Sequence, residues 1–158
     1  MIRALDPARH HFFLAVYGVH AARVLRYAAS FAHVTILPAV EPADFELIDI
    51  HLVSLEPPWD HVCVPSKAVS AVCAGACLLL CASDQGDNWN LLHDAAWRIA
   101  PGPGMADEVA RFVNSLTPAA VAEKRRRTHA IREQLEAMRT RAFGEIWHAM
   151  RAMLNFEF

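Results

Sequence analysis

The chain has 158 residues, of which 54% are hydrophobic and 20% charged, so it suits one compact domain with a sizeable core and does not resemble a disordered segment. Its formal net charge is −2, so no global field favours nucleic acid or an anionic membrane. The longest uncharged window, 68–83, is shorter than the roughly 20 apolar residues of a spanning helix, and the N-terminus has no secretory signal pattern. We therefore expect a cytoplasmic protein with no membrane span and no nucleic-acid partner.

Short apolar runs alternate with stretches of helical spacing along most of the chain. The aromatic run that closes at Gly18 and the β-branched run that stops at Pro38 are typical of buried strands. Periodicity and turn residues then predict strands at 12–18, 34–37, 48–55, 77–82 and 96–101, a helical turn at 42–48, helices at 21–33, 66–74, 87–95 and 105–114, and one or two helices over 118–154.

This alternation predicts a single α/β domain over 1–158, a Rossmann-like three-layer fold with a parallel sheet of about five strands and a long C-terminal helical tail. The residues expected in the core of the sheet are Phe13, Ala15, Ile50, Leu52, Leu78 and Leu80. In such sheets ligands bind beyond the carboxyl ends of the strands, where loops lead into helix N-termini.

The cysteines and histidines offer a metal-binding or disulfide hypothesis, but their spacing does not favour it. Cys73, Cys77 and Cys81 recur every four residues, yet Gly75 interrupts that helix and there is no C-x-x-C pair. We expect small buried thiols rather than ligands. The nine histidines show no H-x-x-x-H pattern, so we expect surface or locally hydrogen-bonded side chains.

The segment "VPSKAVSAVCAG" (64–75) places a lysine in the first turn of a predicted helix, where the backbone dipole is already positive. In one interpretation, Ser66, Lys67 and the free N–H groups converge on an anion, most naturally a phosphate or diphosphate. In the other, Ser66 caps the helix and Lys67 extends into solvent. The motif alone does not choose between them.

The helical tail carries apolar residues at helical spacing beyond a basic cluster at Lys124–Arg127, which we interpret as a solvated face rather than a phosphate contact. The apolar positions are Ile131, Leu135, Met138 and Ala142, followed one register over by Phe143, Trp147, Met150 and Leu154. An exposed face of this kind predicts a homodimer or larger species.

Taken in order, "FFLAVYG", "HVTILPAVEPADFELIDIHLVSL", "VPSKAVSAVCAGACLLLCA" and "WRIAPG" resemble the carboxyl-terminal half of a GT-B glycosyltransferase of family 4. The resemblance implies a domain that binds a nucleotide-diphosphate sugar, for hexosyl transfer, with no metal, no cofactor and no catalytic residue assigned. By resemblance, Pro65, Ser66 and Lys67 face the diphosphate, Ser70 lies at the ribose, the stretch from Pro38 to Val40 borders the base, and Gly18 ends a strand near the donor.

The chain also departs from that family. Many members carry two glutamates eight positions apart, where this chain has Val62 and Ser70. Relative to the family, the amino-terminal acceptor domain and the first, central strand are missing, so we expect the remaining strands in the order 2-1-3-4-5 and no activity from this chain alone. The alternative function is a degenerate, non-enzymatic interaction module that uses the fold as a scaffold, as a monomer or as a homodimer.

Overall fold

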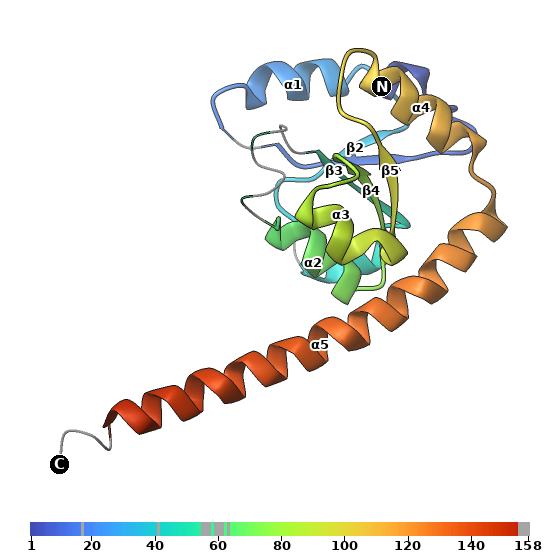
Figure 1. Cartoon of the computed structure of the whole chain (residues 1–158). Helices are drawn as coiled ribbons and strands as arrows, with labels where there is room; N and C mark the ends of the chain where they lie inside the picture. Colours follow the sequence, from blue (N-terminus) through green and yellow to red (C-terminus); the bar gives the residue numbers. More distant parts are fainter. Residues whose placement is uncertain (17, 41, 55–57, 59–61, 63, 155–158) are drawn as a thin grey trace.

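The computed structural model describes residues 1–16, 18–40, 42–54, 58, 62 and 64–154. Helices and short parallel strands alternate up to residue 99, and two helices follow (Figure 1). The strands are β1 (Phe12–Leu14), β2 (Val34–Ile36), β3 (Ile50–Ser54), β4 (Cys77–Cys81) and β5 (Ala96–Ile99); the α-helices are α1 (Ala21–Ala28), α2 (Ser66–Cys73), α3 (Asp87–Leu92), α4 (Met105–Ser115) and α5 (Pro118–Leu154); the 3-10 turns are η1 (Ile2–Ala4), η2 (Pro42–Leu47) and η4 (His93–Ala95).

The predicted α/β class, the parallel strand pairing and the long C-terminal helix are confirmed. Several elements end earlier than the sequence predicts, most clearly the first strand and the first helix. The first helix stops at Ala28 because tighter turns follow, with the N–H of Phe31 bonded to the C=O of Ala28 and the Ser30 hydroxyl bonded to the C=O of Tyr27. Among the described residues, no helix is long and apolar enough to cross a membrane.

The strands form two parallel sheets rather than the single continuous sheet that we expected. One sheet pairs β1 with β2, and the other has the order β3-β4-β5. The neighbours 2-1 and 3-4-5 are thus as predicted, but no pairing joins β1 to β3 in the part of the chain that the structure describes. The side chains of both strands instead line hollows between the two sheets.

The core is centred on β4, whose five residues are all buried. Leu78 and Leu80 pack with α2 and η4 on one face, while Leu79 and Cys81 pack with Val109 of α4 on the other. The three-stranded sheet therefore lies between helices on both faces, as a doubly covered parallel strand requires.

The expected core residues divide according to the strand that carries them. Leu78 and Leu80 are buried, as predicted. The prediction was wrong for Phe13, whose side chain is 42% exposed, and Ala15, Ile50 and Leu52 are only partly buried. The physical reason is the unfilled space between β1 and β3, because residues on both strands face that space instead of a neighbouring strand.

The end of α2 is set by Gly75, which has φ +86°, a backbone conformation that favours glycine. The N–H of Gly75 bonds to the C=O of Val72 (2.9 Å), and the N–H of Ala76 bonds to the C=O of Ala71 (2.9 Å). This Schellman arrangement turns the chain directly into β4. Cys77 and Cys81 at the two ends of that strand are buried free thiols, as expected.

The helix α5 is one continuous helix of 37 residues, and only its first half packs on the rest of the chain. Its contacts run to η4, α2 and β4, and Ile131 is the last of its fully buried residues. Beyond Glu136 every described side chain is exposed, and Figure 1 shows this half extending away from the body. We call residues 137–153 the arm.

Candidate functional site

The larger hollow lies between β1, β3 and the first turn of α2 and has a volume of ≈ 650 Å³. We call it the Ser66 cavity. Its wall is mostly apolar, with polar groups gathered on α2 and β3. The residues that line it are Met1, His11, Phe12, Phe13, Leu14, Ala15, Leu37, Val40, Phe45, Ile48, Ile50, His51, Leu52, Ser66, Lys67 and Ser70.

Pro65 is the N-cap of α2, and Ser66 is the first helical residue. Pro65 has an extended backbone, and its C=O accepts hydrogen bonds from the N–H of Ala68 (2.9 Å) and of Val69 (3.3 Å). There is no side-chain cap hydrogen bond at this helix start. The capping interpretation of Ser66 is therefore wrong, because proline holds the cap position and the serine hydroxyl lies one residue too far along.

The polar groups in this wall favour a negatively charged ligand. The lining contains the Lys67 ammonium, the imidazoles of His11 and His51, and the hydroxyls of Ser66 and Ser70, and it includes no Asp or Glu among the residues that the structure describes. The N-terminus of α2 adds its partial positive charge at the same place. An anion here would meet the Lys67 ammonium, hydroxyls and backbone N–H groups together.

The pKa of His51 is lowered by its position in the Ser66 cavity. Burial lowers the pKa of its imidazole below the usual 6.5, and the positive charge of Lys67 lowers that pKa further. Its ring lies 5.3 Å from the ring of Phe45, in a tilted arrangement. A pKa below 6.5 favours the neutral imidazole at pH 7, and a bound anion would offset the effect of Lys67.

The Ser66 cavity also offers apolar surface of the kind that a nucleobase or sugar face would contact. Phe45 closes it from η2, while Phe12 and Phe13 approach from β1. His11 stands at the edge of β1 and is held there, with its Nε2 2.7 Å from the hydroxyl oxygen of Thr35. The Ser66 cavity thus offers an amphipathic anion both polar and apolar contacts.

The structure brings together four of the seven residues that the sequence singled out. Ser66, Lys67, Ser70 and Val40 line the Ser66 cavity. The other three lie outside that lining: Pro65 at the N-cap of α2, Pro38 exposed after β2, and Gly18 exposed before α1. Gly18 has φ +94°, and its C=O accepts the N–H of Ala21 (3.1 Å), so it shapes the start of α1.

Two residues of this wall were missed by sequence reasoning. His51 and Phe45 were predicted only as parts of a strand and of a helical turn. A signal for His51 was present, because it alternates with Ile50 and Leu52 and therefore points to the opposite face of the strand from them. No comparable signal marked Phe45, whose place depends on how η2 packs against α2.

A smaller hollow of ≈ 320 Å³ also lies between β1 and β3, and Arg9, His10 and Asp49 are in its wall. Its cation is already engaged, because the Arg9 guanidinium donates to the C=O of Asn114 and of Leu116 (2.6 Å each). Burial lowers the pKa of His10, with Arg9 adding to the effect. These contacts fasten the N-terminal segment to α4, so this hollow is a weaker candidate for an anion.

Comparisons with known proteins return no match to any protein-family model, any curated protein or any solved structure.

Proposed function

We propose that this chain binds a nucleotide-diphosphate sugar, with the diphosphate at the N-terminus of α2. The observation that carries the proposal is the lining of the Ser66 cavity, where Lys67, Ser66 and the helix start meet in a wall without a described carboxylate. A lysine in the first turn of a helix opposes the helix dipole, and a bound anion removes that conflict.

The remaining parts of the ligand are assigned by what the wall offers. The volume of ≈ 650 Å³ falls within the roughly 300–1,000 Å³ of small-molecule sites. Ser70 lies one helical turn beyond Ser66 and can hydrogen-bond ribose hydroxyls, while Val40 and Phe45 supply an apolar wall for the base. Pro38 and Gly18 play no direct part in this proposal, because they lie outside the described lining.

We also propose that the two sheets are one interrupted Rossmann-like sheet of order 2-1-3-4-5. The parallel direction of all pairs and the helices on both faces of β4 support this. On this account the chain corresponds to the donor-binding half of a GT-B glycosyltransferase. Hexosyl transfer would then need acceptor-binding residues from another domain, and the chain alone would bind without turnover.

A second function, that of a non-enzymatic interaction module, is favoured by a different observation. The arm exposes large apolar side chains that a monomer rarely leaves in water. This function needs no ligand in the Ser66 cavity, so the two functions give different results in a binding experiment.

The test is calorimetric titration with uridine, guanosine and adenosine diphosphate hexoses. One charge-assisted hydrogen bond contributes roughly 1.5–3 kcal/mol, so Lys67→Ala should weaken binding about ten- to a hundredfold. The matched control is Arg23→Ala, which removes an exposed cation from the first turn of α1. The control should bind as tightly as the wild type. Equal binding by the wild type and Lys67→Ala, or no heat with any of the three nucleotides, would reject the proposal.

A further inference from the structure

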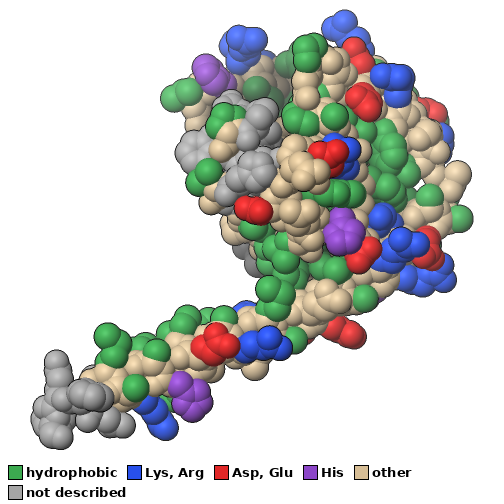
Figure 2. Space-filling view, in the orientation of Figure 1, with side chains coloured by type: hydrophobic (Ala, Val, Ile, Leu, Met, Phe, Trp, Pro, Cys, Tyr) green, Lys and Arg blue, Asp and Glu red, His purple; other side chains and the backbone are tan. Residues whose placement is uncertain are grey.

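The arm exposes large apolar side chains, four of which lie on one face of the helix, while Met138 and Trp147 lie on either side of that face. Six large side chains are exposed there: Met138 55%, Phe143 66%, Ile146 55%, Trp147 55%, Met150 49% and Met153 74%. At 100° per residue, Phe143, Ile146, Met150 and Met153 fall within one stripe, while His148 lies on the opposite side. Figure 2 shows hydrophobic side chains gathered along this part of the molecule.

This stripe continues the face by which α5 already packs on the body. In the docked half, Thr128 and Ile131 are buried and Leu135 packs against the core. Their spacing of three and four residues leads on through Met138 and Ala142 to Ile146. The same helix face is therefore covered over its first half and bare over its second.

We propose that the arm pairs antiparallel with the arm of a second copy of this chain, about a two-fold axis at Phe143. The proposal is independent of the Ser66 cavity and of the nucleotide-sugar function. An antiparallel arrangement places the two bodies at opposite ends of the pair. Leu135, at the edge of one body, then lies opposite Arg151 near the tip of the other arm, so each arm is covered along its length.

Charges agree with this register. In an antiparallel pair centred on residue 143, two residues face each other when their residue numbers add up to about 286. Glu136 then faces Arg151 of the second copy. Arg139 approaches Trp147 of the second copy, whose indole already has the Arg151 guanidinium of its own chain 5.1 Å from the ring centroid. Each contact occurs twice because of the two-fold symmetry.

The overall charge distribution also favours a second copy as the partner. The arm carries three basic side chains and one acidic side chain, whereas residues 1–136 carry twelve basic and fifteen acidic ones. The tip of each arm therefore approaches a body of opposite charge. Burying the four residues of the stripe from each copy removes on the order of 1,000 Å² from water, near the lower bound of specific interfaces.

The first experiment measures mass in solution by sedimentation equilibrium from 1 to 50 µM. The wild type should be a dimer at the upper end of this range, and Phe143→Asp should raise the dimer dissociation constant at least a hundredfold. The matched control is His148→Asp, which places the same charge on the opposite face and should remain dimeric. A wild type that stays monomeric at 50 µM overturns the proposal, as does a monomer that instead binds phosphatidylserine vesicles.

A double-mutant cycle tests the antiparallel register. Glu136→Arg and Arg151→Glu should each raise the dissociation constant about tenfold, and the double variant should return it close to the wild-type value. Glu136 and Arg151 lie about 22 Å apart along one helix, which is well beyond the Debye length at physiological salt. Energetic coupling between these two positions therefore arises only between the two copies of the dimer. Replacing Glu136 also removes its ion pair with Arg132. This loss is the same with Arg151 or with Glu at position 151, so it cancels from the coupling energy. Absence of coupling overturns the antiparallel pairing.

Discussion

At the scale of single residues, the Ser66 cavity places the Lys67 ammonium close enough to the His51 imidazole to lower the pKa of that imidazole. His51 comes from β3 and Lys67 from α2, and the lysine lowers the pKa of the histidine. Neither side chain has a carboxylate partner in the described lining of the cavity. The arrangement is unfavourable without an anion, which is the physical reason for proposing one.

The lowered pKa of His51 makes stability depend on pH. The folded-state pKa of His51 lies below 6.5, so the unfolded chain binds a proton at this histidine more readily than the folded chain does. The free energy of unfolding therefore decreases as the pH falls from about 6.5 towards the folded-state pKa. Urea unfolding at pH 7.5, 6.5 and 5.5 should show a smaller loss for His51→Gln than for the wild type. His148→Gln, exposed on the arm, should follow the wild type. Identical losses in all three proteins would contradict this assignment.

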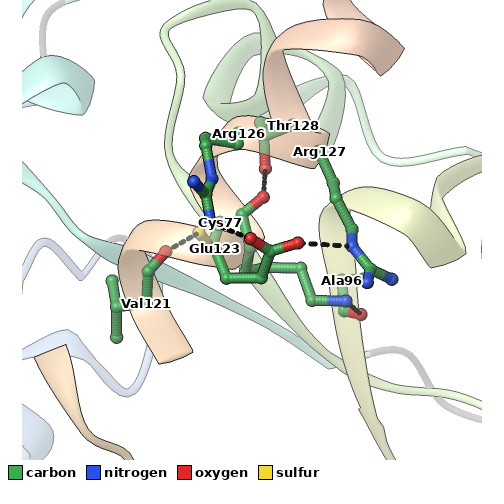
Figure 3. A network of polar contacts seen from close by, with 8 residues as sticks. Cys77, Ala96, Val121, Glu123, Arg126, Arg127 and Thr128 are labelled. Carbon is green, nitrogen blue, oxygen red and sulfur yellow. Dashed lines mark hydrogen bonds and ion pairs between the residues drawn. The ribbon is translucent and has the colours of Figure 1, made fainter. Parts of the chain in front are cut away.

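At the scale of elements, the docked half of α5 is held by a polar network as well as by its apolar face (Figure 3). The Lys124 ammonium donates to the C=O of Ala96 (2.8 Å) and lies 5.4 Å from the centroid of the Trp97 indole. The Cys77 thiol donates to the C=O of Val121 (3.8 Å), and the Thr128 hydroxyl donates to the C=O of Lys124 (3.0 Å). The helix is thus fastened to both β4 and β5.

Lys124→Met should lower the free energy of unfolding by about 1–3 kcal/mol. The methionine keeps an apolar stem over Trp97, but it leaves the buried C=O of Ala96 without the donor that Lys124 supplied. Arg126→Met is the control, because Arg126 is exposed and pairs only with Glu123 at the surface, so its change should stay within about 0.5 kcal/mol. Chemical denaturation measures both values, and an equal effect of the two substitutions would contradict the role given to Lys124.

The sequence predicted the elements well because each is a local pattern. The buried run of β4, the helix start at Ser66 and the turn at Gly75 all follow from neighbouring residues. The basic cluster at 124–127 was only partly predicted: Arg126 and Arg127 are exposed, as a solvated face requires, but Lys124 reaches back to Ala96. That contact joins residues 28 apart in the sequence, so no local pattern reports it.

The arrangement of the sheets was likewise beyond local patterns. The run at 12–18 has the composition of a buried strand, but Phe13 remains 42% exposed because nothing pairs with the β3 side of β1 among the described residues. Strand pairing is a long-range choice that composition does not encode. For the site, the charge of Lys67 against the helix dipole predicted a lining residue, whereas the roles of His51 and Phe45 required the fold.

At the scale of the whole molecule, the chain consists of a compact body, which contains the Ser66 cavity, and the arm, for which we propose a role in association. A chain that ends at Ala137 should keep its fold and its nucleotide-sugar affinity, because the last buried contacts of α5 lie at Ile131 and Leu135. It should be a monomer whose melting temperature does not change between 2 and 50 µM. The full chain should melt at a higher temperature as its concentration rises, because association stabilises the folded state.

These two temperature series are measured by circular dichroism on matched samples. If the melting temperature of the full chain is independent of concentration, the arm has no role in association. Loss of nucleotide-sugar binding in the shortened chain would show that the body and the arm do not act independently.

The central claim is that a diphosphate binds at the start of α2. The most direct measurement is a ¹H–¹⁵N NMR titration of the full chain with the nucleotide-diphosphate hexose that gives the largest calorimetric signal. We predict that the amides of Ser66 and Lys67 shift most, that the side-chain signals of His51 move towards the protonated form, and that the amides of Ala21 and Ala22 at the start of α1 stay in place. Shifts confined to another part of the fold, or none at millimolar ligand, would contradict the claim.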